Sequence, residues 1–149
     1  MRFEKFTQKL QSAIQEAQSL ALGRDNTGID PVHLLAVLLQ DESNIAICQQ
    51  AGASIPALKN GVAKALDNQA TISDPTGDVN LNPNSVKILN LADRQAQKEG
   101  DDFIATEWVL LALAEQGETK KIFESYKRLF DLKKLNNLFI FKYKKDKTI

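Results

Sequence analysis

The chain has 149 residues, 43% of them hydrophobic and 26% charged, and its formal net charge is zero. This length fits one domain that buries about 70% of the surface its unfolded chain exposes, so neither a metal nor a disulfide is required. The single cysteine, Cys48, cannot form a disulfide within the chain, which favours a reducing compartment. There is no apolar run typical of a secretory signal or of a membrane span. We therefore expect a soluble, cytoplasmic protein.

The first predicted elements are two helices of very different length. Apolar side chains recur at steps of three and four, which predicts one helix over residues 3–21 that ends near Gly23. Asp30 is followed by Pro31, a capping carboxylate before a proline in the first helical position. This pair predicts the start of a short buried helix over residues 32–39.

Two more helices complete the first half, and a linker follows them. A short helix is expected over residues 44–50, and Ser54 is expected to cap a fourth helix. Turn residues without periodicity predict a linker over residues 69–81. Asn82, again followed by proline, predicts the start of a long helix that ends before Gly100.

The second half of the chain repeats the order of the first. Residues 90–114 contain a long helix, a glycine, an acidic loop, an isoleucine and a short apolar helix, in the same order as residues 15–39. Segment 29–38 matches segment 104–113 at a constant offset, with Thr106 in place of the proline of the first copy. This pattern indicates an internal duplication of a four-helix unit. No segment alternates with period two, so the sequence predicts an all-α fold.

At these residues the chain resembles the Clp N domain, a double repeat of four helices, and within that family the branch of ClpB-type chaperones. Five segments carry the resemblance: Met1–Lys9, Ala17–Ala21, Ile29–Leu35, Val86–Ala92 and Gly100–Ile104. The resemblance extends from Met1 to about Glu124. It implies two pseudo-symmetric repeats packed as one domain: repeat one over about 1–68, the linker over about 69–81 and repeat two over about 82–124.

The resemblance also implies a function. ClpB-type proteins are hexameric AAA+ ATPases that thread aggregated polypeptides through a central pore, and their N domains bind exposed apolar segments of clients and pass them to that pore. The implied partners are unfolded or aggregated polypeptides and the AAA+ ring of the parent chaperone, and the isolated domain is expected to be a monomer. An adaptor-docking N domain of the ClpA or ClpC type is the alternative.

Motifs for catalysis or cofactor binding are not found in the sequence. Gly23 and Gly28 have the spacing of a phosphate-binding loop, but Ile29 and Asp30 stand where that loop needs lysine and serine or threonine. We therefore expect no ATP binding here and no enzymatic activity, because the ATPase modules would lie elsewhere in the parent chaperone. One cysteine and one histidine cannot complete a zinc site. That histidine, His33, is expected to be structural.

The long helix of repeat two carries more apolar surface than one packing face requires. Ile88 and Leu91 widen the apolar arc around Leu89. Either the arc is buried on two sides between the repeats, or it lines a groove for apolar client segments. We predict a groove that contains these three residues and Trp108, although burial in the core is the alternative for the tryptophan.

Three polar residues join the predicted site through the resemblance alone. Thr7, Asp101 and Glu107 match family positions linked to client handling, and they are expected to surround the groove. Each also has an ordinary interpretation. Thr7 would be a surface residue of the first helix and Asp101 a loop residue. Glu107 would lie in the first turn of a helix, where its charge suits the helix dipole.

After Glu124 the resemblance ends, and residues 125–149 form an atypical basic tail. From Tyr126 onward eight basic residues and two acidic ones give a net charge of +6, so the rest of the chain carries −6. Four side chains at helical spacing are compatible with a last helix: Leu129, Leu132, Leu135 and Phe139. The simplest account is a truncated or frame-shifted product near residue 125. A role of the tail in binding nucleic acid or acidic lipid is the minor alternative, and we expect neither nucleic acid nor membrane as a partner.

Overall fold

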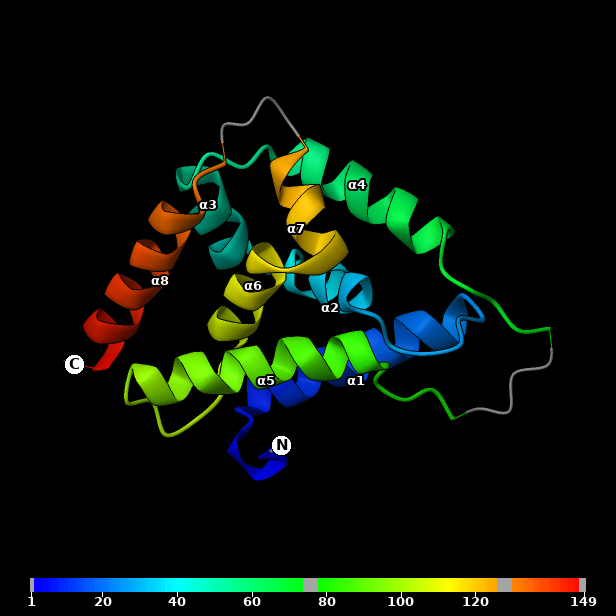
Figure 1. Cartoon of the computed structure of the whole chain (residues 1–149), viewed down its shortest axis with the longest axis horizontal. Helices are drawn as coiled ribbons and strands as arrows, with labels where there is room; N and C mark the ends of the chain where they lie inside the picture. The colour runs from blue at the N-terminus through cyan, green and yellow to red at the C-terminus, as the bar shows by residue number, and fades with distance from the viewer. Residues whose placement is uncertain (1, 74–77, 126–129, 148–149) are drawn as a thin grey trace.

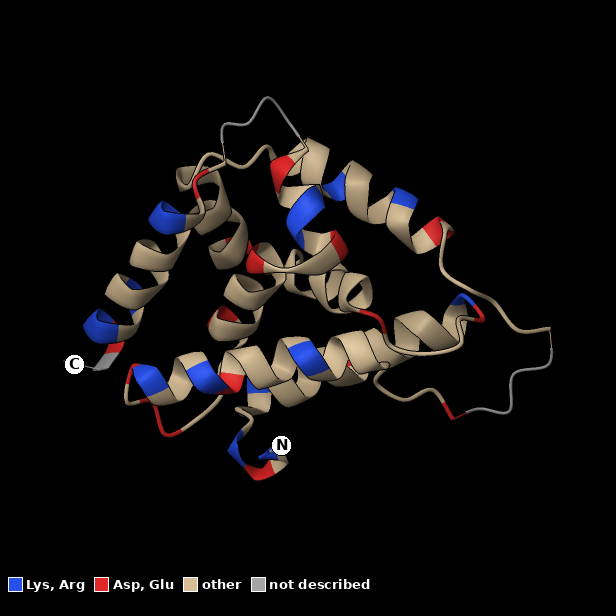
Figure 2. Cartoon of the chain, viewed as in Figure 1, with Lys and Arg blue, Asp and Glu red and all other residues tan. Residues whose placement is uncertain are grey.

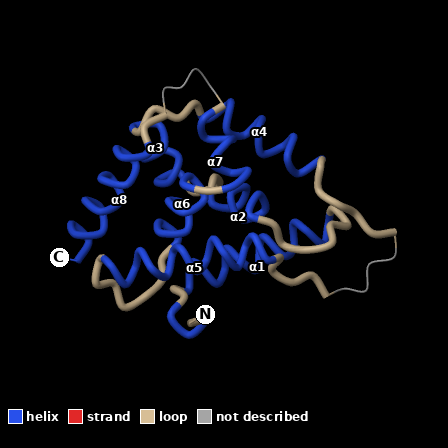
Figure 3. Tube along the Cα trace, viewed as in Figure 1, coloured by secondary structure: helices blue, strands red, loops and turns tan. Residues whose placement is uncertain are grey.

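The computed structural model describes residues 2–73, 78–125 and 130–147, and within them every regular element is a helix (Figures 1 and 3). A 3-10 turn, Phe3–Lys5, opens the chain. Repeat one contains α1 (Gln8–Gly23), α2 (Pro31–Leu38), α3 (Glu42–Gln50) and α4 (Ile55–Asp67). Repeat two contains α5 (Pro83–Lys98), α6 (Thr106–Glu115), α7 (Gly117–Glu124) and α8 (Leu132–Lys147). The predicted all-α fold is confirmed.

The contacts between helices come in matching pairs, as a duplicated fold requires. In each repeat the first helix packs on the second and the fourth packs on the second: α1 and α4 on α2, and α5 and α8 on α6. The third helix of each repeat packs on the fourth helix of the other, α3 on α8 and α4 on α7. The helices α2 and α6 therefore hold equivalent places, as the constant offset between their sequences predicts.

The centre of the fold is formed by α2 and α6, which contact each other (Figure 1). Every residue of α2 except Ala36 is buried, and in α6 only Glu107 and Glu115 are not. A helix that is apolar on all sides is stable only when other helices surround it. The amphipathic helices α1 and α5 cover one side of this central pair, and the remaining four helices lie on the other side (Figure 1).

Local capping fixes the helix starts that the sequence predicts. The carboxylate of Asp30 accepts a hydrogen bond from the amide of Val32 at 3.1 Å. The side chain of Asn82 accepts one from the amide of Ser85 at 2.9 Å, and Ser54 caps α4. Each cap satisfies an amide that the first helical turn leaves without a partner.

The predicted helix over residues 3–21 is wrong at its start. The backbone is extended at Phe6, and α1 begins at Gln8 with Thr7 as its N-cap, whose hydroxyl accepts from the amide of Leu10 at 3.1 Å. Phe3 is 57% exposed and does not join the apolar stripe of α1. The physical reason is that Phe6 pairs with a segment far away in the sequence. The spacing of apolar residues within 3–21 gives no indication of that pairing.

That distant segment is the loop after α5. Phe6 and Ile104 form an isolated parallel β-bridge. The amide of Ile104 donates to the carbonyl of Lys5 at 2.7 Å, and its carbonyl accepts from the amide of Thr7 at 3.1 Å. The segment before the first helix of repeat one is thus bound to repeat two.

Ile29, in the loop after α1 of repeat one, makes the equivalent pair with the segment before α5 of repeat two. Its amide donates to the carbonyl of Asn80 at 2.8 Å, its carbonyl accepts from the amide of Asn82 at 3.0 Å, and it bridges Leu81. Val79 beside this bridge is buried. The described part of the predicted linker is therefore anchored to repeat one, while residues 74–77 lie outside the described residues.

The segment after Glu124 folds against both repeats. Leu135 and Phe139 of α8 are fully buried, and α8 packs on α3 and α6. The amide of Asp131 donates to the carbonyl of Ala51 at 2.8 Å, which anchors the start of α8 at the end of α3. The predicted last helix is present from Leu132 onward, and Leu129 lies outside the described residues. In packing terms α8 is the fourth helix of repeat two.

A pair of substitutions on α8 tests this packing. Phe139→Ala is expected to lower the free energy of unfolding by about 3–5 kcal/mol, because it leaves a cavity in the core. Phe141→Ala is the control two residues away, where the side chain is 68% exposed, and it should change stability by about 0.5 kcal/mol or less. Urea unfolding monitored by circular dichroism measures both values. Equal effects would show that α8 does not pack in the core.

Candidate functional site

The start of α6 brings together three of the predicted site residues. The indole Nε1 of Trp108 donates to Oδ2 of Asp101 at 3.0 Å. Glu107 forms an ion pair with Lys142 of α8, with 3.2 Å between Oε1 and Nζ. The ring of Tyr143 meets the indole edge to face, with 5.5 Å between centroids. These side chains surround a small cavity of about 180 Å³, lined by Asp101, Ala105, Glu107, Trp108, Lys142, Tyr143 and Asp146.

Trp108 is a core residue at this site. Only 1% of its surface is exposed, so its alternative interpretation as core is the one the structure supports. Its bond to Asp101 satisfies a buried N–H that would otherwise be costly. Asp101 is also a loop residue, whose other carboxylate oxygen accepts from the amide of Phe103 at 3.1 Å. Asp101 therefore holds together the loop and the start of α6.

Repeat one contains an equivalent hydrogen bond. His33 occupies the place of Trp108, and its Nε2 lies 2.8 Å from Oδ1 of Asn26, which occupies the place of Asp101. The amide of Asp30 donates to Nδ1 of His33 at 2.8 Å, so the imidazole proton resides on Nε2 and is donated to Asn26. Burial lowers the pKa of His33. His33 is structural, as the sequence predicts.

A second ion pair lies within electrostatic reach of Glu107. Lys9 of α1 pairs with Asp41 at the start of α3, and the charge of Glu107 also acts on Lys9. The hydrogen bond from Lys9 lowers the pKa of Asp41 to about 2. Glu107, which pairs with Lys142, thus links α6 to both α1 and α8. Its side chain is largely covered, with 21% exposed.

The predicted apolar groove along α5 is mostly filled by the protein itself. Ile88 is 3% exposed and Leu89 is fully buried, which matches the alternative of burial between the repeats. Leu91 is half-buried and packs at the edge of the core. Helical periodicity places Leu91 on the flank of Ile88, whereas Asp93 on the other flank pairs with Arg2. The predicted site residues therefore fall into two groups, one on α5 and one at the start of α6, while Thr7 lies apart from both as the N-cap of α1.

Sequence reasoning missed two exposed aromatic side chains on the segments that contain Thr7 and Asp101. Phe3 is 57% and Phe103 is 51% exposed, and they lie on the two segments that the Phe6–Ile104 bridge joins. We call Phe3, Lys5 and Phe103 the aromatic surface. The Nζ atom of Lys5 lies 5.9 Å from the ring centroid of Phe103. The sequence does contain one indication of this surface. Phe103 follows two aspartates in a predicted loop, where no helix could bury its ring.

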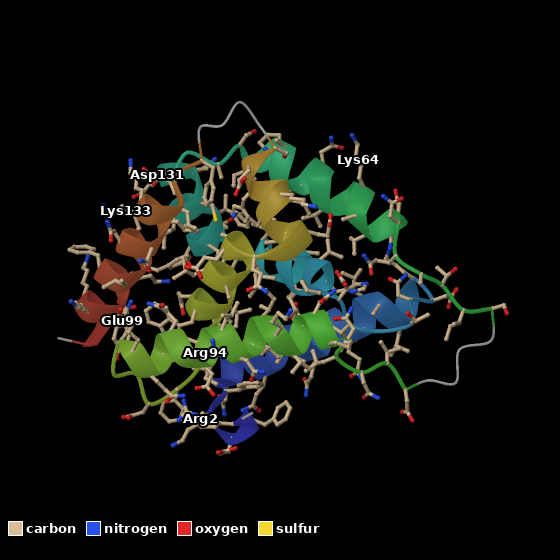
Figure 4. All side chains as sticks on the ribbon, in the orientation of Figure 1. Arg2, Lys64, Arg94, Glu99, Asp131 and Lys133 are labelled. Carbon is tan, nitrogen blue, oxygen red and sulfur yellow. The ribbon has the colours of Figure 1, made fainter. Side chains whose placement is uncertain are left out.

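The aromatic surface rests on a fixed backbone. The Nε atom of Arg2, which Figure 4 labels, donates to both carboxylate oxygens of Asp93 on α5, at 3.1 and 3.2 Å. This pairing lowers the pKa of Asp93. The ring of Phe3 meets the buried ring of Phe6 edge to face, at 5.4 Å between centroids. The N-terminal segment is thus held against α5 and against the loop after it.

Neither a metal-binding cluster nor a membrane-spanning helix is found in the described residues. In residues 2–73, 78–125 and 130–147 there is no cluster of three or more His, Cys, Asp or Glu side chains that could hold a metal ion. No helix of that part of the chain is long and apolar enough to cross a membrane.

Comparison with known proteins identifies the family. The model of the Clp repeat (R) N-terminal domain matches residues 5–126. The chain belongs to the Clp N-terminal domain family. As a Clp N domain it is 44% identical over 138 residues, or 84% of its length, to the chaperone ClpB of Pseudomonas putida. It spans about a sixth of the length of that relative, and its similarity is therefore to one part of a ClpB-type chaperone.

Two solved Clp N domains share the fold. The Hsp104 N-terminal domain of Candida albicans superimposes with a TM-score of 0.80 and 21% identity, covering 91% of this chain and 89% of that one. A ClpV N domain, solved in complex with a VipB peptide, superimposes with a TM-score of 0.67 and 18% identity, covering 92% and 88%. At these identities the likeness concerns the fold alone.

Paired substitutions in the two repeats test the equivalent hydrogen bonds. Asp101→Ala and Asn26→Ala should each lower the free energy of unfolding by about 1–3 kcal/mol, because each leaves a buried ring N–H without an acceptor. Asp102→Ala is the control, since this carboxylate is exposed, and it should cost about 0.5 kcal/mol or less. Urea unfolding followed by the fluorescence of the single tryptophan measures the three. A cost for Asp101→Ala no larger than for Asp102→Ala would contradict the structural role.

His33 predicts a pH dependence of stability. Its folded pKa lies below the unfolded value of about 6.5, so the unfolded chain takes up the proton first. Stability is therefore complete above about pH 6.5 and falls as the pH drops below it. Because His33 is the only histidine, the variant His33→Gln should lack this slope between about pH 7.5 and 5.5. Urea unfolding across that range checks the prediction, and an unchanged slope in the variant would refute it.

Proposed function

We propose that this Clp N domain recruits exposed apolar segments of unfolded or aggregated polypeptides and passes them to the AAA+ ring of a ClpB-type chaperone. The observation that carries the proposal is the aromatic surface. Within the described residues only four large hydrophobic side chains are exposed, and two of them, Phe3 and Phe103, lie on the paired segments beside Thr7. Exposed apolar patches on otherwise well-packed domains usually mark binding sites.

The polar residues around this surface suit an orienting role. Thr7 follows Phe6 on one of the two bridged segments, and Asp101 precedes Phe103 on the other. Glu107 lies in the first turn of α6, next to this loop. The surface would then be supported from within the core by Ile88, Leu89 and Trp108. Leu91 would lie at the edge of the core, outside the main contact. This assignment keeps the predicted residues but gives the contact itself to the two phenylalanines.

The expected affinity is low. A fully buried phenylalanine contributes about 1.5–3 kcal/mol, and ordering a flexible segment offsets part of that gain. Two such contacts leave an affinity in about the micromolar range or weaker. Weak binding suits transfer, because a client must leave the N domain to enter the pore. The ClpV N domain solved with a VipB peptide shows that the same fold can hold a peptide in another protein.

The same proposal defines what the domain does not do. We propose that the segment has no catalytic activity and binds no ATP, which would bind only in the ATPase modules of the parent protein. We also propose that it acts in the cytoplasm as a monomeric unit on a mobile linker. The alternative of adaptor docking, as in ClpA- or ClpC-type N domains, would require a folded partner.

Substitution of the aromatic surface tests the proposal. The double variant Phe3→Ser/Phe103→Ser should weaken binding of a reduced and alkylated unfolded protein at least about tenfold, because two apolar contacts are lost. Ile72→Ser is the control, since Ile72 is 39% exposed on a different loop. NMR titration of the labelled domain measures affinity and confirms the fold. The folded form of the same probe should not bind.

Two outcomes would contradict this proposal. If the double variant binds like the parent while Leu91→Ser weakens binding, the groove beside α5 is the client site. If the folded probe binds as well as the unfolded one, the domain recognises folded partners and the adaptor alternative holds.

A further inference from the structure

The outer face of α8 carries an exposed aromatic ring among lysines. Phe141 is 68% exposed, more than the other three exposed large hydrophobic side chains of the described residues. Helical spacing places it on one face with four exposed lysines. We call this set the α8 face: Lys133, Lys134, Phe141, Lys144 and Lys145. Leu135 and Phe139 on the opposite side of the helix are fully buried, so the orientation of α8 is fixed.

Three of the four lysines of the α8 face have no acidic partner among the described residues. Lys133, Lys134 and Lys144 make no ion pair with any residue that the structure describes. The two acidic residues of this region form no ion pair with these three lysines: Asp131 caps the start of α8 by accepting from the backbone amide of Lys134 at 3.1 Å, and Asp146 lines the cavity at Trp108. Figure 2 shows the basic residues at both ends of α8, and Figure 4 shows Lys133 at the outer edge of the molecule.

We propose that the α8 face is an interaction surface for a short acidic polypeptide segment that carries an apolar residue. The carboxylates of such a segment would pair with the lysines, and its apolar residue would cover the ring of Phe141. Opposite charges speed the encounter and fix the register of the segment, and the ring supplies apolar contact area that lysines alone lack. The surface is separate from the aromatic surface at Phe3 and Phe103, and the proposal does not depend on client binding there.

The charge distribution of the chain favours a short segment over an extended anionic surface. The chain before Tyr126 carries a net charge of −6. A bilayer or a nucleic-acid duplex that lay along α8 would extend beyond the helix and would also face this acidic part of the chain, whose charges act over a screening length of about 8–10 Å. A peptide no longer than the helix avoids most of that repulsion. Only one ring of α8 could enter a bilayer, because the apolar side of the helix is already buried.

Charge reversal on the full chain tests the surface. The probes are a fluorescent peptide of glutamate, glycine and phenylalanine and its counterpart with lysine in place of glutamate. The parent chain should bind the acidic peptide and not the basic one, with affinity that falls as salt rises. The triple variant Lys133→Glu/Lys134→Glu/Lys144→Glu should weaken binding at least about tenfold, and Phe141→Ser should weaken it by a smaller factor.

A matched control separates this face from total charge. Lys59→Glu/Lys64→Glu/Lys87→Glu reverses three exposed lysines outside α8, of which Figure 4 labels Lys64, and should leave binding within about twofold of the parent. Circular dichroism confirms that each variant is folded. Equal loss in the control and the α8 triple variant would overturn the proposal. So would binding of anionic phospholipid vesicles or duplex DNA through the same lysines when the acidic peptide does not bind.

Discussion

Ile29 and Ile104 each lie in the loop after the first helix of one repeat, and each forms backbone hydrogen bonds with the segment before the first helix of the other. The positions of α1 and α5 depend on these crossed pairs, because each pair fixes where a helix begins. The remaining packing follows from that placement, since α1 and α5 cover α2 and α6, the two helices with no polar face. A repeat by itself would leave one partner of each pair unbonded.

The crossed pairs also determine what the surface presents. Pairing of Phe6 with Ile104 keeps Phe3 and Phe103 outside the α-helices, and both rings stay exposed. The fold therefore provides an apolar surface without loosening its core. On the far side, α8 completes the core through Phe139 while keeping its lysines outside. A single domain can in this way hold two surfaces of different chemistry.

Much of the fold can be predicted from the sequence, because each helix cap depends on neighbouring residues and the internal duplication can be seen in the sequence itself. Asp30, Ser54 and Asn82 each lie next to the helix that they start. The start of α1 cannot be found this way, since its cause is Ile104 in the other half of the chain. The same limit applies to the site. Apolar residues of α5 predict burial or a groove equally well, and only the neighbouring helices decide between them. The Asp101–Trp108 bond has a counterpart at the aligned positions of repeat one. The constant offset between the repeats relates Asn26 to Asp101 and His33 to Trp108.

Native-state hydrogen exchange measures the central claim, that the crossed pairs make the two repeats one cooperative unit. The informative amides are those of Thr7, Ile29, Asn82 and Ile104, which donate the crossed bonds. The account predicts that all four exchange only through global unfolding, with the same free energy and the same dependence on denaturant. Exchange of the Ile29 and Asn82 amides at a clearly lower free energy than the other two would show that one pair opens alone, and that the repeats are not held together in this way.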